Sequence, residues 1–174
     1  ALFGCSLYFY VNDIDDRFVH DQYHAESRPW FFHCHLLVAA MVLVIGPLQF
    51  WPWFRKKFTS AHRLLGKVYL ISALGGGLLA FPTIMAYDLP GARLSLLLLA
   101  ALWLFFNVSA WRLAVAKRFD QHRRFMVRGY ICALAFVWIR LLPRIHQATG
   151  LFEFIPDKAM RDTVYEWICW VYPL

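Results

Sequence analysis

Long apolar runs separated by short polar segments dominate this chain. The runs cover residues 30–51, 68–87, 94–111 and 126–142, and each is close to the roughly 20 residues that a helix needs to cross a bilayer. They are continuous, whereas the strands of a membrane barrel alternate apolar and polar positions. The pattern therefore predicts four transmembrane helices. Because the connections are short, neighbouring helices should be antiparallel.

The composition supports this interpretation and extends it to the whole chain. Of 174 residues, 60% are hydrophobic and 17% are charged, which is typical of a membrane protein. We expect one all-α transmembrane domain over residues 1–174, with a four-helix core made of two similar helix pairs. The chain begins and stops inside apolar stretches, so partial helices are expected at 1–10 and 163–174, with further helix beyond the ends.

The net charge of +7 lies mainly in loops 52–67 and 112–128, between the predicted spans. Acidic residues precede the first span. Basic loops of membrane proteins face the cytoplasm, so we expect these two loops on the cytoplasmic side of a bacterial inner (cytoplasmic) membrane. The location of the charge in short loops argues against a nucleic-acid-binding protein, which presents a basic face.

Two similar junctions suggest a shared ligand. The segment from His62, HRLLGKVYLISAL, resembles the segment from His122, HRRFMVRGYICAL. Each follows a basic loop and leads into a predicted span. Two histidines should therefore lie at matching depth on one side of the membrane. They could bind one object together, such as a haem iron, a metal ion or an anionic lipid head group.

The leading hypothesis is a haem-binding electron-transfer protein similar to the b-type cytochromes. In such proteins paired imidazoles from facing helices hold the iron. His62 and His122 would ligate haem b, and Arg63, Arg123 and Arg128 would offset the charge of its propionates. Whether the protein is an enzyme stays open.

His35 and Arg140 are placed near the other side of the membrane. About 24 Å of helix separates His35 from Trp51 at 1.5 Å per residue, so His35 would serve a second site or a quinone. Only one of His33 and His35 can face the bundle interior. Arg140 either clamps an anion or extends to the membrane surface. His146, and a weak metal site at His20 and His24, are further candidates.

The alternative is a non-catalytic accessory or structural subunit of a larger membrane complex, in which the His-Arg junctions bind lipid head groups. Apolar faces rich in Phe and Trp fit lipid or other membrane subunits equally well. The glycine run 75–77 has two interpretations, which are close helix packing and room for a flat ligand. Pro143 and Gly150 are expected to end the fourth span.

Several strings together resemble a known family. They are His35, the string Gly46-Pro47-Leu48-Gln49-Phe50, the string His62-Arg63-Leu64-Leu65-Gly66-Lys67-Val68-Tyr69, the string His122-Arg123-Arg124-Phe125-Met126-Val127-Arg128, and Arg140. The chain is similar, from about residue 28 to 174, to an uncharacterised family of bacterial and fungal predicted multi-pass membrane proteins. The resemblance implies further helices at the ends and no established activity. It also singles out His35, His62, Arg63, Gly66, Tyr69, His122, Arg123 and Arg140.

Overall fold

A computed structural model describes residues 30–85 and 90–174. Its four long helices are α2 (Trp30–Phe50), α4 (Thr59–Met85), α5 (Pro90–Val115) and α6 (Phe119–Thr149). Two shorter ones, α3 (Pro52–Lys57) and α7 (Lys158–Val171), complete the described part. The partial helix expected at 1–10, the acidic residues before the first span and the candidate site at His20 and His24 lie outside the described residues.

The prediction of an all-α multi-pass membrane bundle is confirmed. Four helices of the described residues are long and apolar enough to cross a membrane. Helix α2 nearly matches the apolar run that predicted it, and the other three begin before theirs. For example, α4 begins at Thr59, well before residue 68, and α6 reaches Thr149. Apolar runs mark only the part of a helix that lies in hydrocarbon, whereas its polar turns continue at head-group depth.

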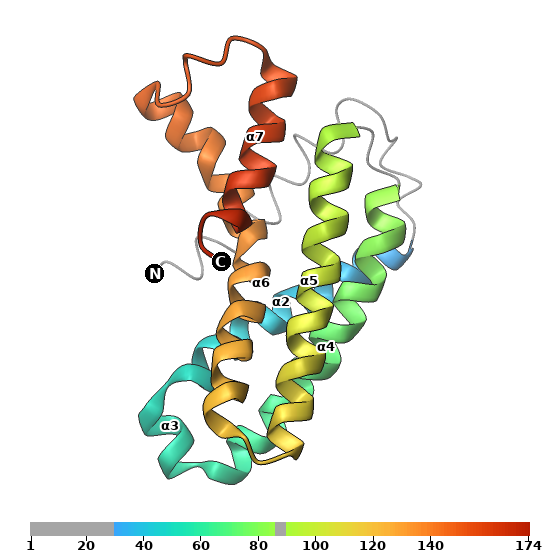
Figure 1. Cartoon of the computed structure of the whole chain (residues 1–174), viewed down its shortest axis with the longest axis vertical. Helices are drawn as coiled ribbons and strands as arrows, with labels where there is room; N and C mark the ends of the chain where they lie inside the picture. The colour runs from blue at the N-terminus through green and yellow to red at the C-terminus, as the bar shows by residue number, and fades with distance from the viewer. Residues whose placement is uncertain (1–29, 86–89) are drawn as a thin grey trace.

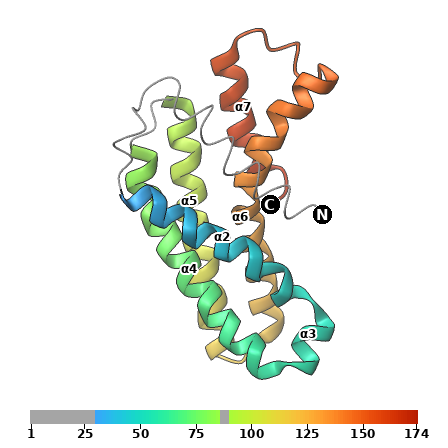
Figure 2. The same cartoon turned by 180° about the vertical axis from the view of Figure 1, so that it is seen from behind.

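The four long helices form a bundle in which α4 and α6 face each other across a diagonal. Helix α2 packs on α4 and α6, and α5 packs between α4 and α6 on the other side. Figures 1 and 2 show α2 running obliquely across the back of the other three. Helix α3 and the α5–α6 connection lie at the same end (Figure 1). We call this end, residues 51–63 and 111–124, the basic end.

The glycine run in α4 serves close helix packing. A Cβ atom on Gly76 would lie 3.2 Å from Trp103 of α5 and 3.2 Å from Val38 of α2. One on Gly77 would lie 2.5 Å from the side chain of Leu104, whereas one on Gly75 would meet nothing within 4 Å. Two of the three glycines therefore let α2 and α5 approach α4, as small residues do between membrane helices. Protein side chains, not a flat ligand, occupy that space.

A second close approach joins α2 to α6. Pro47 lies inside α2 and has no N–H, so the carbonyl of Leu43, four residues earlier, loses its helical donor. The hydroxyl of Tyr130 in α6 donates to this carbonyl at 3.2 Å. A Cβ atom on Gly46 would collide with the Tyr130 ring. Gly46 thus admits the ring, and Pro47 frees the acceptor that the ring's hydroxyl needs.

The end opposite the basic end differs from the prediction. Helix α6 continues through Pro143, which is buried, and stops only at Gly150, whose φ is 68°. The prediction that Pro143 ends the helix is wrong, and the prediction for Gly150 is confirmed. A proline within a membrane helix is tolerated when neighbouring groups satisfy the freed backbone.

Helix α7 starts at Lys158, earlier than the apolar stretch 163–174. The carboxylate of Asp157 caps it by accepting from the Met160 N–H at 2.6 Å. The helix returns along α6 and α5 (Figure 1). The Trp170 indole N–H donates to the Ser95 hydroxyl at 2.9 Å, and that hydroxyl donates to the Glu166 carbonyl at 3.1 Å. These bonds fix α7 to α5.

Candidate ligand site at the basic end

The structure brings His62 and His122 to one end of the bundle. His62 is the fourth residue of α4 and His122 is the fourth residue of α6, so both sit one turn inside helices that face each other across the diagonal. Both side chains are half-buried. His62 lies within electrostatic range of His122, and of Arg55 and Arg63 as well. The two histidines therefore occupy the same position, one turn from the start, in their two helices.

A backbone carbonyl orients the ring of His122. Its Nδ1 lies 2.8 Å from the carbonyl oxygen of Ala110 in α5. A carbonyl can only accept, so Nδ1 carries the hydrogen and Nε2 of the neutral ring carries the lone pair. This arrangement is the one found behind metal-bound histidines, where a carbonyl or carboxylate holds the ring nitrogen that is not coordinated.

The ring of His62 lacks such a partner. Its Nδ1 is buried and has no hydrogen bond to any described residue. Leaving a buried polar atom unpaired costs about 1–3 kcal/mol. The usual partner of such an atom is a ligand or a water molecule. His62 is thus the side chain at this end that most needs one.

Two histidines are fewer ligands than a protein-bound metal ion usually takes. No group of three or more His, Cys, Asp or Glu side chains in residues 30–85 and 90–174 is arranged to hold a metal. Structural zinc needs four protein ligands, and catalytic zinc needs three. A porphyrin supplies four nitrogens of its own, so two imidazoles complete the coordination of its iron.

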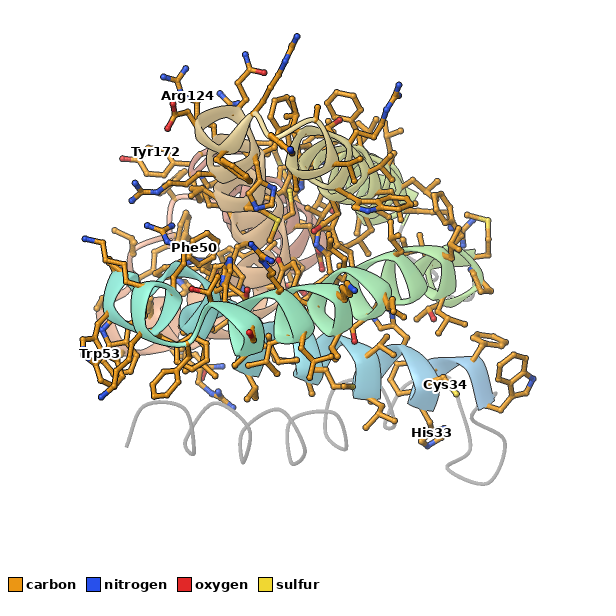
Figure 3. All side chains as sticks on the ribbon, turned by 90° about the horizontal axis from the view of Figure 1, so that it is seen from below. His33, Cys34, Phe50, Trp53, Arg124 and Tyr172 are labelled. Carbon is orange, nitrogen blue, oxygen red and sulfur yellow. The ribbon has the colours of Figure 1, made fainter. Side chains whose placement is uncertain are left out.

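The arginines predicted to serve this site are on the same two helices as its histidines. Arg63, Arg123 and Arg128 are exposed, and the Arg128 guanidinium lies 5.7 Å from the centroid of the Phe125 ring. Arg124 points outward from the same region (Figure 3). Arg55 is half-buried and within electrostatic range of His62. Because Arg55 lies in the short helix α3, which the apolar pattern did not reveal, sequence reasoning did not single it out.

His35 and Arg140 form a separate polar pair further along the bundle. His35 is 5% exposed, its Nδ1 lies 2.9 Å from the Gly76 carbonyl, and its ring packs edge-on against Phe136 at 5.9 Å. Arg140 lies within electrostatic range of His35 and donates to the Phe136 carbonyl at 2.8 Å. The structure thus places these two together and keeps them apart from His62 and His122.

The remaining histidines of the described chain take no part in either group. His33 is exposed and points away from the bundle (Figure 3), so His35 is the one of the two that faces the interior. His146 accepts a hydrogen bond from the Phe152 N–H at 3.4 Å and packs near Tyr165. Its contacts stabilise the turn after α6.

Four further buried polar groups were not predicted to form a site, although the family resemblance singled out one of them, Tyr69. Gln49 Nε2, Tyr69 OH, Trp103 Nε1 and Asn107 Oδ1 are buried and have no hydrogen-bond partner among the described residues. They come from α2, α4 and α5 and lie inside the bundle. The signal available in the sequence was a polar residue inside or beside an apolar run, namely Gln49 and Asn107. That signal by itself also fits ordinary hydrogen bonds between helices.

Comparison with known proteins now places the chain. The sequence profile of DUF2306, described as a predicted membrane protein, matches residues 32–174. The chain belongs to this family. The DUF2306 match covers all six described helices except the first two residues of α2, so it includes His35, His62 and His122. No curated protein and no solved structure matches the chain.

Proposed function

We propose that this DUF2306 protein binds a b-type haem at the basic end and transfers electrons within the membrane. His62 of α4 and His122 of α6 would hold its iron. The observation that carries the proposal is the state of the two rings. The Nδ1 of His122 is fixed by the Ala110 carbonyl, and the buried Nδ1 of His62 has no partner among the described residues. Both lie at one depth on helices that face each other.

The chain's own residues would define the properties of such a site. The Ala110 carbonyl holds His122 in the tautomer that presents Nε2. The positive charges of Arg55, Arg63, Arg123 and Arg128 would offset the propionates. Bound haem would supply a one-electron carrier whose potential depends on its axial ligands and on nearby charge. The proposed orientation keeps the basic end on the cytoplasmic side, in a bacterial inner membrane.

The pair formed by His35 and Arg140 supports a second part of the proposal. They bring an imidazole and a guanidinium within electrostatic range of each other inside an apolar span, where ionisable groups often have a functional role. They would bind the carbonyl oxygens of a quinone, which is itself an electron carrier. This assignment is independent of the axial ligands, because the two groups lie in different parts of the bundle.

The test is the absorption spectrum of the detergent-purified protein. We expect a Soret band and split α bands on reduction. His62→Ala and His122→Ala should each remove most of the pigment, whereas His33→Ala, on the exposed face, should retain it. Size-exclusion profiles of the three variants would show that each is still assembled. Iron-free protein without a Soret band, expressed with ample haem, would refute the proposal.

A second candidate is a non-catalytic membrane subunit whose basic end binds anionic lipid. A groove of about 530 Å³ between α5 and α6 favours it, because three arginines line it: Arg112, Arg124 and Arg128. Ser109 and Gln121 add polar groups, and Leu113 and Phe125 add apolar surface. Guanidinium groups bind phosphate in a bidentate manner, and basic clusters beside a membrane helix bind anionic head groups.

Lipid selectivity separates the two candidates. In nanodiscs, phosphatidylglycerol should raise the unfolding temperature relative to phosphatidylcholine, and Arg124→Gln with Arg128→Gln should remove the difference. Lys56→Gln with Lys57→Gln, on α3, is the matched control. A lipid effect in a protein that never carries pigment would favour the subunit. Pigment without any lipid effect would favour the haem protein.

A further inference from the structure

We propose that a file of bound water molecules runs along the interior of the bundle from His62 to the middle of the membrane. Its protein contacts would be Gln49, Tyr69, Asn107 and Trp103. The file would hydrate the interior of the bundle as far as Tyr69 and Trp103. This inference goes beyond the haem proposal and does not depend on it.

The burial of these groups is the first argument. The exposed fraction is 6% for Gln49, 0% for Tyr69, 1% for Asn107 and 2% for Trp103. Each carries a buried polar atom without a partner in the described protein. Native proteins leave few buried polar atoms unpaired, and bound water is the usual partner where protein atoms are missing. Several such atoms in one bundle indicate a shared cause.

Their placement is the second argument. His62, Gly66 and Tyr69 follow one another at successive turns on one face of α4. Gln49 of α2 fills the space beside Gly66, since a Cβ atom on Gly66 would lie 3.3 Å from Gln49 Oε1. The unpartnered amide of Gln49 therefore lies between the levels of His62 and Tyr69.

Helices α5 and α6 border the same region of the interior. A Cβ atom on Gly129 of α6 would lie 3.1 Å from the amide of Asn107. Tyr69 lies within electrostatic range of Tyr130 and Cys132, the next residues of α6 in this layer. The Asn107 amide nitrogen donates to the Trp103 carbonyl at 2.8 Å, which leaves its oxygen as the free acceptor. Both Tyr69 and Asn107 thus reach the same stretch of α6.

The chemistry of the atoms matches water. Gln49 Nε2 and Trp103 Nε1 can only donate, Asn107 Oδ1 can only accept, and the Tyr69 hydroxyl can do both. A water molecule accepts two hydrogen bonds and donates two, so it can join donors to acceptors in any order. Cations would be repelled by the donors, and an apolar ligand would leave every one of these atoms unsatisfied.

Hydroxyl-radical footprinting of the unaltered protein is the direct test, because radicals formed from bound water oxidise the side chains beside it. Trp103 and Trp170 make a matched pair, since both are almost fully buried. The Trp170 N–H is bonded to Ser95, whereas the Trp103 N–H has no partner among residues 30–85 and 90–174. We expect oxidation of Trp103 and Tyr69 to exceed that of Trp170 several-fold. Equal protection of all three would overturn the proposal.

The sign of a stability change gives an independent test. If water holds the network together, Tyr69→Phe and Gln49→Met should each lower the Tm by about 2–4 °C, the shift that a loss of about 1 kcal/mol produces in a protein of this size. The double variant should lose less than the sum, because both partners of the network are then gone. If the interior is dry, each substitution removes an unsatisfied atom and raises the Tm. That rise would overturn the proposal.

Discussion

The two similar junctions, at the starts of α4 and α6, have the same residue types but different hydrogen bonding. In α6, His122 is bonded to the Ala110 carbonyl and Tyr130 is bonded to the Leu43 carbonyl. In α4, the corresponding atoms of His62 and Tyr69 are buried and have no hydrogen-bond partner in the part of the chain that the structure describes. Like sequences thus produce one junction that is satisfied by the protein and one that is not.

The difference comes from what each helix faces. Helix α6 packs against a stretch of α2 that Pro47 has opened, and against the end of α5, where the Ala110 carbonyl is within reach. Helix α4 packs on α2 and α5, and no described residue there is hydrogen-bonded to His62 Nδ1 or to the Tyr69 hydroxyl. Buried polar groups without partners mark the places where a folded protein still has binding capacity. The α4 junction is therefore the one that we expect to respond to a ligand.

The largest effect is expected where α6 meets α2. Gly46→Ala should place a Cβ atom against the Tyr130 ring and destabilise the protein by about 1–3 kcal/mol, as overpacking does. Thermal unfolding in detergent measures the loss. Gly75→Ala is the matched control, since nothing lies within 4 Å of its Cβ position. Alanine is the better helix former by about 1 kcal/mol, so the control should not destabilise. Equal losses in both variants would contradict the close contact.

The histidines give a sharper comparison. The amide nitrogen of asparagine can occupy roughly the position of histidine Nδ1 and donate to the same carbonyl. Pigment-free His122→Asn should therefore be more stable than His122→Ala by about 0.5–1.5 kcal/mol, the usual net contribution of one hydrogen bond. His62→Asn should have no such advantage over His62→Ala. Both comparisons are made by thermal unfolding of the apoprotein. An equal benefit at both positions would show that His62 has a protein partner after all.

The sequence revealed the class of fold, because apolar runs mark the spans. It also indicated that His62 and His122 occupy matching places, since they lie six and four residues before their runs, and each is the fourth residue of its helix. It did not reveal α3, whose sequence PWFRKK is too short and too basic for a span. It also placed a helix end at Pro143, since local rules treat an internal proline as a break.

The partners of the polar side chains could not be predicted in the same way. Whether the hydroxyl of Tyr130 or that of Tyr69 finds an acceptor depends on how α2 crosses the bundle, and the crossing is a property of the packing of four helices. The strings GPLQF and HRRFMVRGY contain Gly46, Pro47 and Tyr130, but they are far apart in the sequence. Only the assembled bundle shows that these three residues form one contact.

The smallest expected effect concerns the coupling of Pro47 and Tyr130. In the unaltered protein, Tyr130→Phe should cost about 1 kcal/mol, because the Leu43 carbonyl loses its donor. With Pro47→Ala in place, the new N–H of residue 47 can donate to that carbonyl, so Tyr130→Phe should cost about half as much or less. A double-mutant cycle of unfolding free energies isolates this coupling from the general effect of removing a proline. Pro82→Ala, in α4, should be additive with Tyr130→Phe, because its freed carbonyl belongs to Leu78. If Pro47→Ala is additive as well, Tyr130 does not replace the lost helical donor, and the satisfied state of the α6 junction must have another origin.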